Sequence, residues 1–333
     1  MQQKNIWIAV GIVVIAVAGF FVFQKQEPKS FPTVRLGIQT SPVAGLVKVA
    51  IDKGFFEKEG IAVDVKEFTA GKFALQAMIG GSLDLVTPAE FPITLAVLGG
   101  EKLSILTEVN ETAGGFPMVL RKEGETFDAK TYFAKKRKIG TSFGGGAEFF
   151  TADFFRKYNI SPSQYELVNL KPEDMPIALA NGDVDGVAIH EPFAHLAIQK
   201  TGEDKVFAVK SDDLYSETLV LTANTNWVSQ NEETVEKFLR ALKKAEDFIK
   251  KNPEESMDIV SSFTKLDKET LRSIWPNLTL SLNLDKKLVP TMQKEAQWAK
   301  DTGKIKNETA IPNFRDNIFE APLKKVSPSA VEL

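Results

Sequence analysis

Residues 77–90 read AMIGGSLDLVTPAE, and residues 178–191 read ALANGDVDGVAIHE, a second version of the same pattern. The two stretches align without gaps and share Ala77 with Ala178, Gly81 with Gly182, Asp84 with Asp185, Val86 with Val187, and Glu90 with Glu191. At the same offset, Thr40-Ser41 falls on Thr141-Ser142. Gly and Asp between a helix and a strand are ordinary turn residues, so a common topology explains about half of these matches without common ancestry. In either case the repeat predicts two lobes of similar plan.

Around each repeat, the sequence alternates between strand-like and helix-like segments. Strands are predicted at residues 34–38, 61–68 and 83–86, and again at 138–140, 165–170 and 184–189. Helices are predicted between them, at residues 42–53 and 72–79 and at 147–158 and 172–180. A β-α-β-α-β order predicts a mostly parallel sheet flanked by helices, with right-handed crossovers. The predicted fold class is therefore α/β with two lobes.

The segments outside the repeats predict how the lobes are joined. Residues 103–108 are strand-like, and the extended runs at 116–121 and 216–224 are assigned to two inter-lobe crossings. Further helices are expected at 232–251, 254–262, 267–275 and 285–301, packed back on the first lobe. The expected domains are an anchor or signal at residues 1–30, lobe 1 at 31–112 plus 222–320, lobe 2 at 113–221, and a C-terminal tail at 321–333.

Composition excludes several classes of function. The 333 residues are enough for about two domains, with 43% hydrophobic and 26% charged residues, as in globular proteins. Lys plus Arg (41) against Asp plus Glu (44) leaves a net charge of −3 with no long run of one sign, so nucleic acid is not an expected partner. The absence of cysteine from the sequence excludes disulfides, thiolate metal sites and cysteine nucleophiles.

The N-terminal segment is directed to a membrane. Residues 6–23 carry no charge and as a helix would span roughly 27 Å, enough for a bilayer core. The Ala16-Val17-Ala18 stretch fits a signal cleavage site, but cleavage there would leave Phe20, Phe21 and Phe23 on the mature end. We therefore favour an uncleaved anchor over a cleaved signal, and both over a buried core helix. Either leading interpretation places the body outside the cytoplasm, because Lys4 favours the inner side.

Ligands of open parallel sheets sit beyond the carboxyl ends of the strands, where loops meet helix N-termini. The candidate ligand-binding residues at these ends and at the first crossing are Gln39, Thr40, Ser41, Thr87, Pro88, Glu90, Asn110, Glu111, Thr141, Ser142, Gly144, Gly145, Gly146, His190 and Glu191. For Asn110 and Glu111, which would lie at the back of the cleft, an ordinary polar turn is the alternative.

The stretch GTSFGGGAEFF at residues 140–150 is the sharpest of these signals. Its glycines let the backbone approach a ligand, and a helix N-terminus attracts an anion or a dipolar oxygen. It is neither a dinucleotide fingerprint nor a P-loop, so nucleotide binding is not indicated. The alternative is a flexible glycine-rich turn without a ligand.

Two glutamates fall on matching strand ends. If Glu90 and Glu191 face the cleft from opposite lobes, they suggest a cationic or amine-bearing ligand, or general acid/base chemistry. The alternative is that each complements a helix dipole. His190 and His195 are the only histidines, and without cysteine or an H-E-x-x-H motif they do not predict a metal site. His190 remains a candidate for a hydrogen bond to a ligand.

Taken together, these motifs resemble the periplasmic substrate-binding proteins of ABC importers for nitrate, sulfonates, taurine and thiamine-pyrimidine precursors. The resemblance covers about residues 33–305 and rests most specifically on KGFFEKEGI at 53–61 and on the D-G-x-x-x-x-E-P pattern at 185–192. It implies a type II-like bilobed fold that closes by hinge rotation on a ligand in the cleft. It further implies a monomer without a cofactor, partnered by a permease, its ATPase and the membrane.

The sequence departs from that family in two ways. It lacks the cysteine of a lipoprotein signal, so tethering would depend on the N-terminal helix. Gly145 and Gly146 stand where sulfonate binders often carry serine, and Glu90 adds negative charge, which disfavours a simple inorganic anion. A small organic molecule, such as a sulfonate, an amine or a pyrimidine-like compound, is the expected ligand, with an amine or heteroaromatic part preferred.

Two other functions remain open from the sequence. Thiamine-pyrimidine synthases share the implied fold but resemble this chain less, because their histidine- and cysteine-rich iron segment is missing here. Porphyrin-pathway deaminases attach their cofactor through cysteine, which is also missing. A membrane-anchored sensor is the remaining alternative, and a non-enzymatic binding protein is the expectation.

Overall fold

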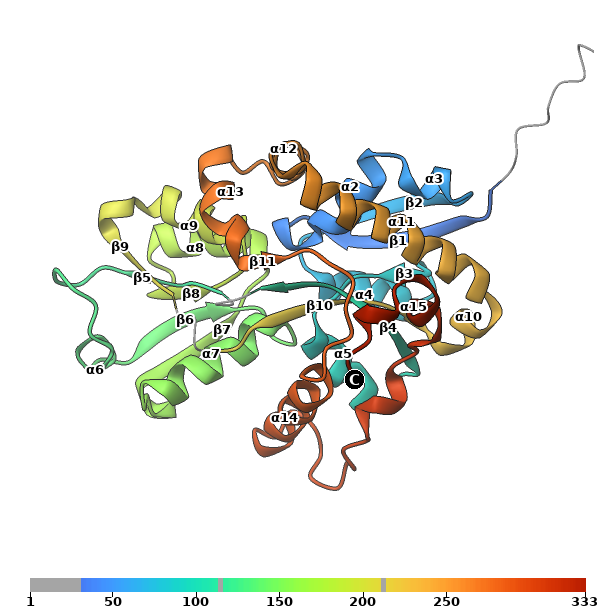
Figure 1. Cartoon of the computed structure of the whole chain (residues 1–333). Coiled ribbons are helices and arrows are strands. Elements are labelled where there is room, and N and C mark those ends of the chain that lie inside the picture. Colours follow the sequence, from blue (N-terminus) through green and yellow to red (C-terminus); the bar gives the residue numbers. More distant parts are fainter. Residues whose placement is uncertain (1–30, 113–115, 211–213) are drawn as a thin grey trace, which may run out of the picture. The chain divides into compact units, whose positions relative to one another are not determined.

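The computed structural model describes residues 31–112, 116–210 and 214–333 (Figure 1). The chain divides into two compact units, Met1–Pro32 and Thr33–Leu333, and all helices and strands below belong to the second. The predicted anchor at residues 6–23 lies outside the described residues and stays a prediction. Among the described residues, no helix has the length and apolar character that a membrane span requires.

The first sheet contains six strands in the order β11-β4-β10-β3-β1-β2. Its strands are β1 (Thr33–Gln39), β2 (Ala62–Phe68), β3 (Leu85–Val86), β4 (Leu103–Thr112), β10 (Glu217–Asn224) and β11 (Leu278–Thr279). Strand β1 pairs in parallel with β2 and β3, whereas β10 runs antiparallel between β3 and β4. The parallel order predicted for the first half of the chain is confirmed.

The second sheet repeats this arrangement in the order β7-β6-β8-β5-β9. Its strands are β5 (Met118–Arg121), β6 (Arg137–Thr141), β7 (Tyr165–Asn169), β8 (Gly186–Ala188) and β9 (Val206–Val209). Strand β6 pairs in parallel with β7 and β8, and β5 runs antiparallel to β8 and β9. The chain passes between the sheets twice, from β4 to β5 and from β9 to β10. The runs that the sequence assigned to the crossings are the strands that flank these passages.

Helices cover both sheets (Figure 1). Those of the first lobe are α2 (Gly45–Asp52), α3 (Phe55–Lys58), α4 (Gly71–Ile79), α5 (Glu90–Leu98), α10 (Thr225–Gln230), α11 (Glu232–Lys251), α12 (Pro253–Thr264), α13 (Lys268–Ile274), α14 (Leu288–Asp301) and α15 (Ala321–Val326). Those of the second are α6 (Ala129–Tyr132), α7 (Gly146–Lys157), α8 (Met175–Asn181) and α9 (Phe193–Thr201).

Helix α11 shows why the C-terminal segments return to the first sheet. Its apolar stripe, which includes Phe238 and Leu242, is fully buried and packs on α2, α3 and α15. Residues 321–333, set apart as a tail in the sequence analysis, include α15, whose Leu323 is buried in the same core. Fully burying one such side chain stabilises the fold by about 1.5–3 kcal/mol.

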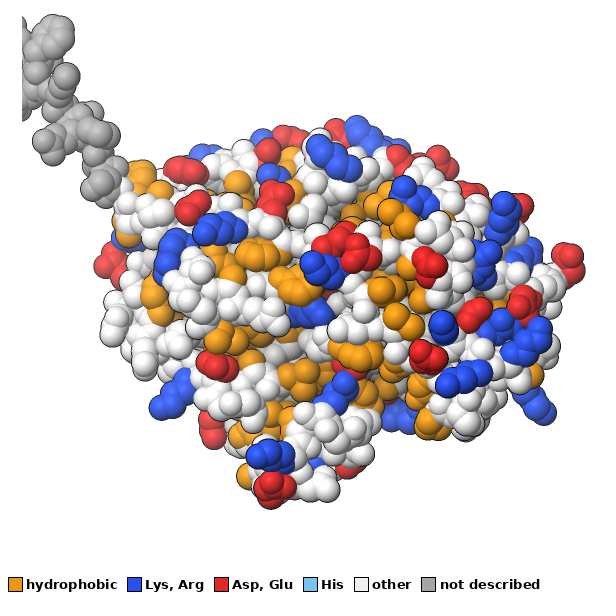
Figure 2. Space-filling model, turned by 180° about the vertical axis from the view of Figure 1, so that it is seen from behind, with side chains coloured by type: hydrophobic (Ala, Val, Ile, Leu, Met, Phe, Trp, Pro, Cys, Tyr) orange, Lys and Arg blue, Asp and Glu red, His pale blue; other side chains and the backbone are white. Residues whose placement is uncertain are grey.

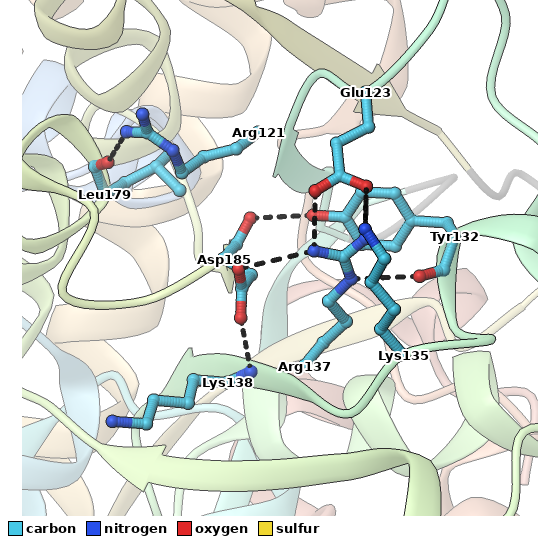
Figure 3. A network of polar contacts seen from close by, with 8 residues as sticks. All are labelled: Arg121, Glu123, Tyr132, Lys135, Arg137, Lys138, Leu179 and Asp185. Atoms are coloured by element: carbon cyan, nitrogen blue, oxygen red, sulfur yellow. Dashed lines mark hydrogen bonds and ion pairs between the residues drawn. The ribbon is translucent and has the colours of Figure 1, made fainter.

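The repeated aspartates hold equivalent places in the two sheets. Asp84 accepts hydrogen bonds from the backbone N–H and the guanidinium of Arg35, at the start of β1. Asp185 likewise accepts from the backbone N–H of Lys138 at 2.8 Å, at the start of β6 (Figure 3). Arg137, whose side chain is buried, lies 3.6 Å from Asp185 and donates to Glu123. Each aspartate therefore ties the strand that follows a helix to its parallel neighbour.

The surface carries mixed charge. On the face shown in Figure 2, Lys and Arg side chains are interspersed with Asp and Glu. This pattern agrees with the balanced composition and does not form a single-sign field there.

Gly186 tests how tightly the second sheet is packed. A Cβ at this position would lie 2.4 Å from Leu120 Cδ2 and 3.2 Å from the Val119 carbonyl oxygen, and both neighbours are buried. We expect Gly186→Ala to lower the free energy of unfolding by about 1–3 kcal/mol, because the strands must shift to admit the methyl group. The measurement is urea denaturation followed by circular dichroism.

Gly80 provides the matched control. It has a φ of −72° and a Cβ there would have no contact closer than 3.4 Å. Gly80→Ala is expected to leave stability unchanged or slightly raised. Equal midpoints for Gly186→Ala and Gly80→Ala would contradict the close packing of β8 on β5.

Candidate functional site

Two adjoining cavities lie where the loops that follow the parallel strands of both sheets meet. The larger has a volume of about 80 Å³ and the smaller about 30 Å³, and both are lined by Phe116, His190 and Glu217. The larger is also lined by Ser41 and Glu191, and by residues of α13, β11 and the turn between them. The smaller is also lined by Gln39, Lys72, Ser142, Gly145 and Gly146. Both lobes therefore contribute to one site.

Seven of the predicted ligand-binding residues line these cavities. They are Gln39, Ser41, Ser142, Gly145, Gly146, His190 and Glu191. Thr40, Thr87, Pro88, Glu90, Asn110, Thr141 and Gly144 lie close in sequence or space but are not among the lining residues. The ligand role of all these residues stays a prediction.

Several of the predicted residues, both lining and non-lining, hold the loops in place. The backbone N–H of Gly144 donates to the Glu148 carboxylate at 2.8 Å, and the Gln39 side chain accepts from the Gly71 N–H at 2.8 Å. The Pro88 carbonyl accepts from the backbone N–H of Val220 at 3.0 Å. Thr141 is fully buried. These contacts fix the backbone that surrounds the cavities.

Glu111 belongs to a different depression. With Glu108, Asp153, Lys287 and other charged residues it lines a groove of about 300 Å³. Acidic and basic side chains are both present there, and Lys294 lies 3.5 Å from Asp153. Asn110, on the same strand, donates to Thr112, which lines the larger cavity.

Buried polar atoms without partners gather at the two cavities. Ser41 Oγ, Ser142 Oγ and His190 Nε2 are buried, and none has a hydrogen-bond partner among the described residues. Leaving such an atom unsatisfied costs about 1–3 kcal/mol, so native structures rarely do so without a reason. Ser41 lies in the first lobe, whereas Ser142 and His190 lie in the second. A ligand that bonds to all three would contact both lobes.

His190 offers an acceptor to the cavity. Its Nδ1 lies 3.0 Å from the carbonyl oxygen of Glu191, and burial lowers the pKa of the ring. The neutral ring therefore carries its proton on Nδ1, which donates to that carbonyl, and Nε2 presents a lone pair. Glu191 itself accepts from the backbone N–H of His195 at 2.9 Å, and burial raises its pKa.

Glu217, at the start of β10, is a lining residue that the sequence reasoning did not single out. It is only 7% exposed, lines both cavities, and has no hydrogen bond or ion pair within the described part of the chain. Burial and the nearby Glu90 charge raise the pKa of Glu217 well above its ordinary value. The one available sequence signal was a glutamate opening the largely apolar run ETLVLTAN at residues 217–224.

Glu90 occupies a different environment from its repeat partner Glu191. It begins α5, is completely buried, and accepts hydrogen bonds from the Tyr215 hydroxyl at 2.5 Å and the Thr218 N–H at 2.9 Å. Glu295 of α14, also completely buried, accepts from the Thr94 hydroxyl at 2.8 Å. Glu90 therefore joins α5 to the second crossing.

Contacts between the lobes surround the site. Lys72 of α4 donates to the Phe143 carbonyl at 2.6 Å, and burial lowers the pKa of this lysine. Lys304 bonds to Glu148 of α7 at 2.5 Å. The Phe149 ring packs against Phe91 and Trp298 at centroid distances of 5.5 and 5.3 Å. These contacts close the cavities on the side of α4 and α14.

The family model described as NMT1-like family matches residues 27–263. The chain belongs to the NMT1-like family. It is 25% identical over 299 residues to a Bacillus subtilis (strain 168) protein whose name assigns it to the binding of aliphatic sulfonates, covering 88% of each chain. It is 24% identical to the taurine-binding periplasmic protein of Escherichia coli (strain K12), covering 57% of this chain and 56% of the relative.

A solved structure shares the fold of this NMT1-like protein. The alkanesulfonate-binding protein SsuA from Xanthomonas axonopodis pv. citri, bound to MOPS, superposes with a TM-score of 0.74 at 17% identity. The match covers 88% of this chain and 100% of SsuA. The resemblance stated from the sequence is thereby confirmed, as is the two-lobed periplasmic-binding-protein fold.

The buried carboxyls predict a dependence of stability on pH. Burial raises the pKa of Glu90 to about 7 and also raises the pKa of Glu217 and Glu295. Neighbouring carboxyls raise these pKa values further, Glu108 for Glu90, and Glu90 for Glu217 and Glu295. The folded chain thus holds protons that the unfolded chain releases above pH 4.5, so this stabilisation is complete below that pH and is lost as the pH rises. We expect the free energy of unfolding to fall by about 1–3 kcal/mol between pH 5 and pH 8.

The variant Glu295→Gln separates this effect from other titrations. It removes one titrating group, so its loss of stability over the same range should be smaller. Glu308→Gln, at an exposed position, should keep the full loss. Melting temperatures at pH 5 and pH 8 and constant ionic strength give the comparison. Parallel losses for Glu295→Gln and the unmodified protein would contradict this origin of the pH dependence.

Proposed function

We propose that this chain is the extracytoplasmic solute-binding protein of an ABC importer. It captures a small organic molecule in the cavities between its lobes and delivers it to a membrane permease driven by an ATPase. The observation that carries the proposal is the convergence of unpartnered buried polar atoms from both lobes, Ser41, Ser142 and His190, on one site. The names of the sulfonate- and taurine-binding relatives support it.

The mechanism follows from the two-sided site. A ligand that bonds to Ser41 in one lobe and to Ser142 or His190 in the other gains all its contacts only when the lobes are together. It therefore binds the closed state more tightly and shifts the population towards it. The permease then distinguishes loaded from empty protein by the relative position of the lobes.

The groups that line the site suit the binding of a polar ligand: hydroxyls, an imidazole lone pair and carboxyls face it. The names of the relatives likewise describe binding proteins. We assign the chain a non-enzymatic role as a monomer, held at the membrane by residues 6–23 or released after their cleavage.

A thermal-shift panel on the full chain in detergent micelles tests the proposed function. The compounds are nitrate, bicarbonate, taurine, alkanesulfonates, alkylamines, pyrimidines and amino acids. A ligand present at 100 times its Kd stabilises the protein by about 2.7 kcal/mol, which raises Tm by several degrees. A clear rise with one class is the expected result. No rise with any class, in protein shown to be folded and free of bound ligand, would overturn the proposal.

The double variant Ser142→Ala, Glu191→Gln tests the site. Removing a hydroxyl and a carboxylate that line the cavities should weaken binding of the identified ligand at least tenfold. The Tm without ligand should change little, because Ser142 Oγ has no partner to lose. Isothermal titration calorimetry gives the affinity, and the matched control Ser229→Ala alters an exposed serine on α10. Unchanged affinity in the double variant would show that the ligand does not bind in these cavities.

A further inference from the structure

The N-terminus of α7 opens onto the smaller cavity, and a carboxyl of the protein itself lies against it. A Cβ on Gly146 would stand 2.5 Å from Glu217 Oε1 and 3.2 Å from the Tyr215 hydroxyl. A side chain at position 146 would therefore displace the Glu217 carboxyl from this place. The sequence predicts that this helix end attracts an anion or a dipolar oxygen, and in the structure the Glu217 carboxyl lies beside Gly146 without accepting a hydrogen bond from the described residues.

Glu217 differs from the neighbouring glutamates in having no partner. Glu90 accepts from Tyr215 and Thr218, and Glu148 accepts from Lys304 and Gly144. Glu217 is also buried and lines both cavities, but it accepts no hydrogen bond within the described chain. An ionised carboxylate buried without donors is costly, and burial accordingly raises the pKa of Glu217. A cationic donor from the ligand would stabilise the ionised form, which no group of the described chain does.

The other groups at this point do not supply that donor. His190 Nε2, which also lines both cavities, presents a lone pair. Lys72 donates to the Phe143 carbonyl. Lys210 lines the larger cavity, where its charge partly opposes the rise that burial causes in the pKa of Glu191. The part shared by the two cavities therefore presents acceptors, Glu217 and His190, beside the helix end.

We propose that Glu217 sets the charge class of the ligand, so that the site takes an organic cation with N–H groups, a protonated amine or amidine, directed at Glu217 and His190. This inference rests on the proposed function. A cation stabilises the ionised form of Glu217 when it binds, whereas a sulfonate or nitrate beside this side chain favours the protonated form and gains no ion pair with it. A zwitterion binds with its ammonium group at Glu217.

Three probes with the same two-carbon skeleton test this assignment: ethylammonium, taurine and ethanesulfonate. They carry a cation, both charges, and an anion. Binding to the full chain in detergent micelles is measured by titration calorimetry and thermal shift for the unmodified protein and for Glu217→Gln and Glu217→Ala. Glu308→Gln is the control for removal of one negative charge at an exposed position.

We expect ethylammonium and taurine, but not ethanesulfonate, to raise the Tm of the unmodified protein and of Glu308→Gln. Glu217→Gln should weaken binding of the cation at least tenfold and should strengthen binding of ethanesulfonate. Because glutamine is isosteric with the protonated acid and does not ionise, the Tm of this variant without ligand should equal or exceed that of the parent. If this variant nevertheless fails to fold, Glu217→Ala gives the same comparison.

The other outcomes separate the two proposals. If the unmodified protein binds ethanesulfonate or nitrate but does not bind ethylammonium, the proposed role of Glu217 is overturned. The solute-binding function is then unaffected. If none of the three probes binds but the wider panel yields a ligand, that ligand is measured against Glu217→Gln. A tenfold loss with a ligand that bears N–H groups supports the inference, and an unchanged affinity overturns it. Failure of the whole panel overturns the proposed function and, with it, this inference.

Discussion

The Glu217 carboxyl lies against the first residue of α7, Gly146, where a Cβ would stand 2.5 Å from Glu217 Oε1. This contact joins an antiparallel strand of the first sheet to the first turn of a helix in the second lobe. The adjoining Tyr215 hydroxyl is fixed in turn by Glu90 at the start of α5. The second crossing is therefore held from both lobes within a few residues. Because the same segment lines both cavities, the shape of the site depends on how closely β10 approaches α7.

The polar groups buried near this contact divide into two kinds. Glu90 receives hydrogen bonds from Tyr215 and Thr218, and Glu295 Oε2 receives one from Thr94, whereas Glu295 Oε1 has no partner among the described residues. These bonds join α5 to α14 and to the crossing. Ser41, Ser142, His190 and Glu217 face the cavities without donors or acceptors to match them. Proteins break such local rules mainly where function requires it, and the large cores of both lobes offset the cost. The division separates the groups that stabilise the fold from those available to a ligand.

Local sequence patterns were sufficient for most of the fold but for only part of the site. Apolar alternation and helical spacing predicted the parallel strands of both sheets. The repeated Asp84 and Asp185 accept equivalent backbone hydrogen bonds at the starts of β1 and β6. The strand-end rule selected Ser41, Ser142 and Glu191, because all parallel strands of a sheet end at one edge. It did not distinguish Glu90 from Glu191, since what separates them is Tyr215, a residue distant in sequence. The sequence did not indicate Glu217, because a glutamate at the start of a strand is common. Its burial depends on the antiparallel pairing of β10 with β3 and β4, which local patterns do not predict.

The fold depends on the whole pattern of apolar residues, whereas the choice of ligand depends on a few side chains at the site. This chain shares its arrangement of strands and helices with an alkanesulfonate-binding protein at a TM-score of 0.74 and only 17% identity. Many different sets of apolar residues can therefore form the same fold. The charge at a helix N-terminus is set by one side chain and can change without disturbing that arrangement. An anionic ligand exploits the free N–H groups and the dipole of such a helix end. Here the Glu217 carboxyl of the protein itself lies beside that helix end, where burial raises its pKa, and a positive charge is the partner that stabilises its ionised form. The family fold thus provides a site lined by both lobes. Under our proposal, Glu217 beside Gly146 determines the charge of the ligand that this site binds.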